Sequence, residues 1–150
     1  MKPFHYRFEQ IQMFQERKKE ETEAAYQQSV DSFEKVATKL YHLLKEKEDL
    51  IAYQQEELKE GFMIEEIHHH TDYLKYLEKE IAKVQQEVLK ARAKMDWYED
   101  KLLEDTIELK KYEKVKEKDY KQYQEEQKHY EAAQLDEIST IQFSRKEQGW

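Results

Sequence analysis

The sequence predicts an all-α protein: an antiparallel two-helix coiled-coil hairpin with a turn near Gly61 and a C-terminal helical overhang. The 150 residues include only 2 glycines and 1 proline, so the chain has few points at which it can turn. Charged residues make up 40%, and apolar residues recur in steps of three and four, the spacing of a helix that packs along one stripe. This composition is typical of long helices rather than of a globule.

The first helix is expected over residues 4–58, because Pro3 suits the start of a helix. Its packing seam is formed by apolar and small side chains, namely Phe4, Phe8, Ile11, Thr22, Ala25, Ser29, Phe33, Val36, Leu40, Leu43, Leu50 and Leu58. Polar residues fill the gaps in this seam, namely Gln15, Lys18, Lys47 and Gln54. Buried polar groups reduce stability and help to fix the register of the two helices, so we expect a coiled coil of low stability.

The turn is expected over residues 59–63, around the one glycine between Pro3 and Gly149. Charged residues lie on both sides of Gly61 within "ELKEGFMIEE", as is typical of a turn. The alternative is a parallel dimer of straight helices, in which each chain would carry Gly61 inside a helix at a cost of about 1 kcal/mol relative to Ala. We therefore favour the hairpin and expect a monomer.

The second helix is expected over residues 64–135, because the same spacing continues without a helix breaker. Its seam residues are Ile64, Ile67, Leu74, Leu77, Ile81, Val84, Val88, Ala91, Met95, Tyr98, Leu102, Leu109, Tyr112, Tyr123 and Tyr130. Whether residues 62–70 form a separate short helix, and whether the tail 136–150 is ordered, stays open.

Folding the chain at Gly61 gives a single elongated domain over residues 1–150. It places Phe4 opposite residues 118–120 and Leu40 opposite Ala82. Residues beyond about 120 then have no partner in the first helix and form the overhang.

Composition and motifs argue against several functions. Cysteine is absent, no glycine-rich phosphate loop or nucleophile motif occurs, and a two-helix rod has no deep pocket, so we expect neither an enzyme nor a bound cofactor. A net charge of -8 disfavours nucleic acid as a partner. No apolar run approaches the length of a membrane span, so we expect a soluble cytoplasmic protein without membrane insertion.

Three consecutive histidines, His68, His69 and His70, resemble a metal site at first sight. On a helix, however, successive side chains diverge by about 100°. Four residues after each histidine, where a helical metal pair needs its second ligand, a carboxylate follows only His68, namely Asp72, so we expect no metal site.

The charge distribution suggests where a partner binds. Residues 1–20 and 105–121, which the hairpin brings together, carry eleven positive and eight negative charges, whereas the rest of the chain is strongly acidic. A mildly basic open end suits an acidic partner, although ordinary scatter of surface charge explains the same counts.

Several segments together resemble the FliJ family of flagellar export proteins. They are "YRFEQIQ", "YQQSVDSFEKVATKLY", "LKEGFMIEEIHHHTDYLKYLEKEI", "YEKVKEKDYKQY" and "LDEISTIQF". The lone turn glycine, the aromatic residue after it and the Asp-Glu-Ile near the end carry the resemblance more specifically than the charged heptads do.

The resemblance implies a helical hairpin of the flagellar type III export apparatus, at the cytoplasmic face of the membrane by the basal body. It implies contacts with the hexameric export ATPase FliI, whose ring holds the end with the termini, and with the cytoplasmic domain of the export gate protein FlhA. It also implies coupling of ATP hydrolysis to export and an escort role for export chaperones.

The resemblance also suggests contact residues. The gate-binding stripe of the family falls on Tyr73 and Leu77, while its other two positions carry Glu80 and Val84 here. For the ATPase we expect contacts from the basic open end, namely Arg17, Lys18, Lys19, Lys110 and Lys111. Two rival functions stay open: the equivalent stalk of a virulence type III secretion system, and a self-associating structural coiled coil.

Overall fold

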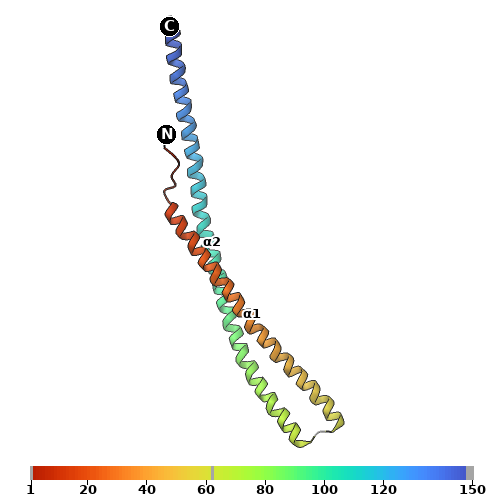
Figure 1. Ribbon diagram of the computed structural model, residues 1–150. Helices are drawn as coiled ribbons and strands as arrows, with labels where there is room; N and C mark the ends of the chain where they lie inside the picture. Colours follow the sequence, from red (N-terminus) through yellow and green to blue (C-terminus); the bar gives the residue numbers. More distant parts are fainter. Residues whose placement is uncertain (1, 62, 148–150) are drawn as a thin grey trace. The chain divides into compact units, whose positions relative to one another are not determined.

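Two long α-helices make up most of the chain in the computed structural model, which describes residues 2–61 and 63–147. Helix α1 spans Glu9–Glu60 and helix α2 spans Ile64–Glu147 (Figure 1). Those described residues contain no strand. The predicted all-α fold is confirmed, and so is the hairpin of two helices packed against each other.

The turn lies at Gly61, as the sequence predicts. Gly61 has a φ of 96°, a left-handed conformation that only glycine adopts without strain. Its N–H donates to the carbonyl of Glu57 at 3.0 Å, which satisfies one of the free carbonyls at the end of α1. Beyond the turn, the carbonyl of Met63 accepts from the N–H groups of Glu66 and Ile67 and starts α2.

The start of the first helix was predicted wrongly. Helix α1 begins at Glu9, not at residue 4; residues 2–6 have no regular secondary structure, and residues 7–8 form a turn. Phe4, Tyr6 and Phe8 are buried or half-buried, whereas the residues between them are exposed. A helix would turn Phe4 and Tyr6 to nearly opposite sides. We call residues 2–8 the N-terminal strap.

The second helix runs further than residue 135. Helix α2 is continuous from Ile64 to Glu147, so residues 64–70 belong to the long helix and residues 136–147 are helical. No proline or glycine lies within it. Neither helix, within the described residues, is apolar enough over a sufficient length to cross a bilayer.

The chain divides into two compact units, with boundaries after Lys19 and after Glu104. The turn unit comprises residues 20–104 and contains the hairpin turn. The terminal unit combines the residues before Glu20 with those from Asp105 onward. Each unit is a pair of antiparallel segments with its own packing, and we describe each by itself.

The core of the turn unit is a narrow seam. Leu77 and Val84 are 1% and 0% exposed, and Ile81 is also buried. Two polar residues of α1, Thr22 and Ser29, complete the buried set, and the Ser29 hydroxyl donates to its own helix at the Tyr26 carbonyl, 2.6 Å away. These positions match the predicted seam, including its small polar members.

Near the turn the seam is not covered. Ile64 and Ile67 were predicted as seam residues, but they are 73% and 39% exposed, and Leu58 is 61% exposed. Their spacing is correct, yet the sequence spacing does not show whether an apolar partner lies opposite. This end of the turn unit therefore carries apolar side chains on its surface.

The terminal unit pairs the strap and the first turns of α1 with α2. Tyr6, Leu109 and the charged Asp105 are its buried residues. Phe4 packs edge-on against Tyr120, with ring centroids 5.2 Å apart, so the predicted register holds here. Residues 128–147 are exposed throughout, and in Figure 1 this part of α2 extends beyond the strap. This bare stretch is the overhang, and it begins later than the predicted residue 120 because the strap packs on Tyr120 and Tyr123.

Candidate protein-binding surfaces

Aromatic side chains hold the N-terminal strap on α2. Phe4 lies between Tyr120 and Tyr123, with ring centroids 5.2 and 5.5 Å away, and Phe8 lies 6.4 Å from Tyr112. Edge-on and tilted aromatic pairs at these distances contribute roughly 0.5–1.5 kcal/mol each beyond the area they bury. The strap is therefore a packed part of the terminal unit, although it is not helical.

Tyr6 is the buried anchor of the strap. Its side chain is 4% exposed, and its hydroxyl donates to the carbonyl of Tyr112 at 2.8 Å. Burial raises the pKa of this phenol above its ordinary value, and the negative charges of Asp119 and Tyr112 add to the effect while Arg7 opposes it. The hydroxyl therefore stays protonated and able to donate.

An ion pair also links the strap to α2. The Arg7 guanidinium lies 3.6 Å from the Asp119 carboxylate and 4.7 Å from the centre of the Phe8 ring. Arg7 is well exposed, so this ion pair contributes at most about 1 kcal/mol.

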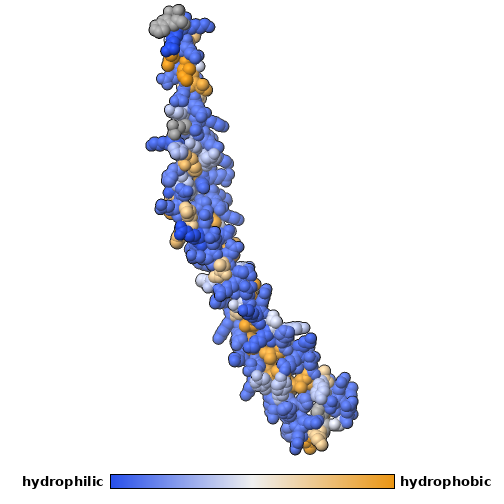
Figure 2. Space-filling model, viewed as in Figure 1, coloured by the Kyte–Doolittle hydropathy of each residue, from blue (hydrophilic) through white to orange (hydrophobic). Residues whose placement is uncertain are grey.

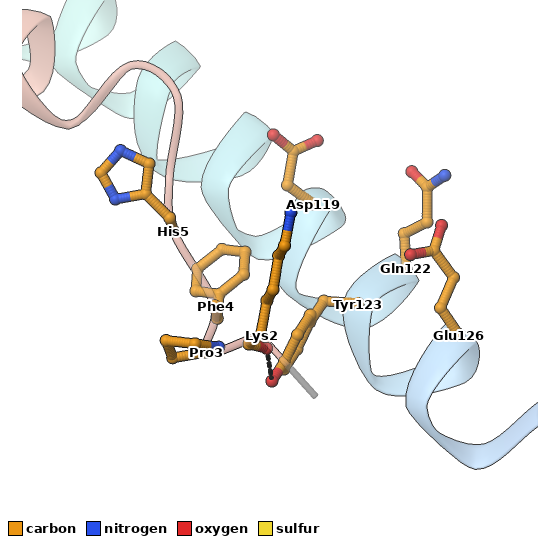
Figure 3. Close-up of a pocket in the computed structure, with 8 residues that line it drawn as sticks. All are labelled: Lys2, Pro3, Phe4, His5, Asp119, Gln122, Tyr123 and Glu126. Carbon is orange, nitrogen blue, oxygen red and sulfur yellow. Dashed lines mark hydrogen bonds between the residues drawn. The ribbon is translucent and has the colours of Figure 1, made fainter. Parts of the chain in front are cut away.

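An open recess lies between the strap and α2 (Figure 3). Its walls are formed by Lys2, Pro3, Phe4, His5, Asp119, Gln122, Tyr123 and Glu126. The Tyr123 hydroxyl crosses it and donates to the Lys2 carbonyl at 2.9 Å. Within the part of the chain that the structure describes, no three His, Cys, Asp or Glu side chains come together as a metal site. The recess lies on the surface of the terminal unit and is open to solvent.

The five predicted ATPase-binding cations all belong to the terminal unit, but they differ in their surroundings. Arg17 and Lys110 are exposed. Lys111 pairs with Glu108 at 3.4 Å on the surface of its own helix. Lys19 is half-buried.

Lys18 has a structural contact. Its ammonium lies 3.8 Å from the Asp105 carboxylate, whose side chain is 3% exposed. Asp105 is a buried charge that the seam prediction passed over between Leu102 and Leu109. The signal was available, because the regular spacing leaves a position at 105 that no apolar residue fills.

The overhang of α2 carries large apolar side chains. Four of them are between 47% and 64% exposed, namely Leu135, Ile138, Ile141 and Phe143. Figure 2 shows orange surface near this end of α2 among the blue charged residues. An exposed cluster of this kind on an otherwise charged helix is typical of a protein contact.

The two predicted gate-binding residues, both in the turn unit, have different exposure. Tyr73 is 39% exposed, its ring stacks on Tyr76 with centroids 6.0 Å apart, and its hydroxyl donates to the Glu46 carboxylate. That hydrogen bond is the main cause of the raised pKa of Tyr73. Leu77 is 1% exposed and fills the seam. Gate binding by Tyr73 and Leu77 stays a prediction, and of the two only Tyr73 is exposed.

The three histidines lie on different sides of α2, as helical geometry requires. His68 and His69 are exposed, whereas His70 is half-buried against the Tyr53 ring at 5.5 Å. The rings of His69 and His70 lie 6.2 Å apart. The structure assigns these imidazoles to the surface and flank of the turn end.

Comparison with known proteins identifies the family. The family model described as flagellar FliJ protein matches residues 4–148. This chain belongs to the FliJ family. A FliJ protein of Bacillus subtilis (strain 168) is 35% identical over 140 residues, which cover 93% of this chain and 95% of the relative. No solved structure matches the chain. As a FliJ-family protein, the chain is a component of the flagellar protein export apparatus.

Proposed function

We propose that this FliJ-family protein is a stalk that links the export ATPase to the export gate. The terminal unit binds the hexameric ATPase FliI, and the turn unit binds the cytoplasmic domain of FlhA. The protein works as a monomer at the cytoplasmic face of the membrane by the flagellar basal body. Its role is mechanical, not enzymatic: it couples ATP hydrolysis to export.

The observation that carries the ATPase contact is the bare overhang. Twenty exposed residues of α2, 128–147, project past the strap without an α1 segment beside them. Leu135, Ile138, Ile141 and Phe143 expose apolar surface there, and such surface gains free energy when a partner covers it. The clamped strap stiffens the base of this projection and so supports a role in transmitting force.

Basic side chains of the terminal unit support an electrostatic part of the contact. Arg17, Lys19 and Lys110 lie on the same unit as the overhang. Arg17 and Lys110 are exposed and Lys19 is half-buried. Cations at the surface speed association with an acidic partner and contribute modestly to affinity. Lys18 is a weaker candidate because its ammonium already lies beside the buried Asp105 carboxylate.

The gate contact rests on the stacked rings of Tyr73 and Tyr76, which are 39% and 55% exposed. Tyrosine pairs are frequent anchors of protein interfaces, since a rigid ring covers much area at low entropic cost. Export chaperones are a further proposed partner. The match to the flagellar family favours flagellar export over a virulence system.

Replacing Leu135, Ile138, Ile141 and Phe143 by serine tests the ATPase contact. Purified export ATPase should bind this variant at least tenfold more weakly, because each lost anchor contributes on the order of 1 kcal/mol. The matched control carries serine at Leu89 and Leu103 of the turn unit, which are both 60% exposed. Equal binding of both variants would show that the overhang does not contact the ATPase.

The basic contribution is tested with Arg17→Glu, Lys19→Glu and Lys110→Glu in one chain, leaving Lys18 in place so that the packing around Asp105 is kept. Binding to the ATPase should weaken severalfold at low salt and converge on wild type at high salt. Lys35→Glu with Lys39→Glu, exposed residues of the turn unit, is the control.

Tyr73→Ala with Tyr76→Ala tests the gate contact. Affinity for the purified cytoplasmic domain of the gate should fall about tenfold or more, with circular dichroism unchanged. Tyr73→Phe keeps the ring and loses only the bond to Glu46, so it should bind nearly as well as wild type. Full affinity of the double variant rules out this surface.

A further inference from the structure

The turn end of the turn unit has apolar side chains without cover. Met63 and Ile64 are 72% and 73% exposed, Leu58 is 61% exposed and Ile67 is 39% exposed. They come from both sides of the turn, the last turn of α1 and the start of α2. We call these four residues the apolar tip.

A small cavity indents this tip. Its volume is about 80 Å³, and its lining comes from α1 and α2, namely Gln54, Leu58, Ile67, His70 and Thr71. The lining mixes two aliphatic side chains with amide, hydroxyl and imidazole groups. Figure 2 shows orange and pale surface at this end of the molecule.

Carboxylates border the tip. Residues 56–66 contain five glutamates and one lysine. These carboxylates raise the pKa of the nearby Tyr53 phenol. Glu57 has the largest effect, and burial, Glu66 and Glu60 add to it. Because Glu57 and Glu60 belong to α1 and Glu66 to α2, acidic groups of both helices converge on one place.

We propose that the apolar tip is a docking surface for a partner protein whose apolar groove is bordered by lysines and arginines. The groove covers Met63, Ile64 and Leu58, while its cations meet the surrounding carboxylates. An apolar centre within a charged border is the usual anatomy of a protein interface. This surface is additional to the ATPase and gate contacts and depends on neither.

Charge decides between this partner and two others. A second copy docked tip to tip would bring two sets of glutamates together, and like charges facing one another across an interface oppose association. An anionic lipid surface would repel the same glutamates. Among these three partners, only one with a basic border is attracted to these carboxylates, so that they favour association.

The test begins with full-length protein in flagellated cells, with the photo-crosslinking amino acid p-benzoylphenylalanine in place of Met63. Irradiation should attach one protein, and mass spectrometry should place the link among apolar residues with lysine or arginine nearby. The same amino acid in place of Lys39, exposed on α1 within the turn unit, is the control. Adding Tyr73→Ala should leave the Met63 link intact.

The linked protein is then purified and its affinity measured. Met63→Ser with Ile64→Ser should weaken binding about tenfold or more, since both side chains are anchors. Glu60→Lys with Glu66→Lys should weaken it severalfold at low salt and less at high salt. Because all four residues are exposed, the helical content of both variants should equal that of wild type.

Several results would overturn the proposal. They are the absence of a link, a link only to a second copy of this chain, and unchanged affinity of either variant. Vesicles of phosphatidylcholine and phosphatidylglycerol provide the lipid comparison: sedimentation of the wild type with them, lost in the Met63→Ser and Ile64→Ser variant, would assign the tip to membrane instead.

Discussion

The Lys18 ammonium lies 3.8 Å from an Asp105 carboxylate oxygen whose side chain is 3% exposed. A buried carboxylate loses most of its hydration and needs nearby cations or hydrogen bonds to stay charged. Lys18 spans the interface between the two helical segments of the terminal unit to reach it. The pair therefore fixes which residues face each other there, at some cost in stability.

Lys18→Met should destabilise the protein by about 1–3 kcal/mol, because the carboxylate of Asp105 loses a cation within its buried site. Lys18→Met combined with Asp105→Leu should recover most of this loss, since apolar residues of similar size pack in such positions without desolvated charge. Urea denaturation followed by circular dichroism measures both. A single variant as stable as wild type would show that the ion pair contributes nothing.

Gly61→Ala should lower stability by about 1–2 kcal/mol, because a φ of 96° is unfavourable for a residue with a Cβ atom. The cost is one of backbone conformation alone, since a Cβ there would meet no atom within 4 Å. Gly61→Asn is the matched control and should lose less, because asparagine tolerates left-handed conformations better. Thermal melts of the wild type, Gly61→Ala and Gly61→Asn proteins measure the order of their stabilities.

Tyr6→Phe should make the protein less sensitive to alkaline pH. The raised pKa of Tyr6 means that its contribution is present below the ordinary tyrosine value of about 10 and is lost as the pH rises above it. At about pH 8 the variant should be less stable by roughly 1 kcal/mol, through the lost bond to the Tyr112 carbonyl.

The comparison is made by thermal melts between about pH 8 and about pH 11, where the other tyrosines titrate in both proteins. The gap between wild type and Tyr6→Phe should narrow as the pH rises. A constant gap over this range would mean that the Tyr6 phenol ionises no differently in the folded and unfolded chains.

Leu77→Ala and Tyr73→Ala should separate packing from binding. Leu77 is 1% exposed, so its truncation should cost about 2–5 kcal/mol. Tyr73 is 39% exposed and its truncation should cost about 1 kcal/mol or less. Urea denaturation of each variant measures these costs, and a large loss for Tyr73→Ala would assign it to the core.

Much of the fold could be predicted from the sequence. Steps of three and four between apolar residues indicate a helical seam, and one glycine in a long breaker-free chain indicates one turn. Leu77, Ile81 and Val84 are buried where that spacing places them. The apolar spacing identifies these buried residues because a packed helix presents the same face every three to four residues.

The remainder depends on what lies opposite each residue. Ile64 and Ile67 follow the seam spacing but face no cover, which only the three-dimensional arrangement reveals. The strap was missed because Phe4 and Phe8, which lie four residues apart, also fit a helical period. For the candidate contacts, the spacing assigns Leu77 to the seam and leaves Tyr73 beside it, and their exposures of 1% and 39% agree with that prediction.

The strap has a consequence for how the protein is made. The Tyr123 hydroxyl donates to the Lys2 carbonyl, and the Tyr6 hydroxyl donates to the Tyr112 carbonyl, so the strap finds its place only after the part of α2 that contains Tyr112 and Tyr123 has been made. The turn unit, whose two helical arms adjoin in the sequence, can close while synthesis continues. Docking of the strap on α2 then follows the closure of the turn unit in the assembly of the hairpin.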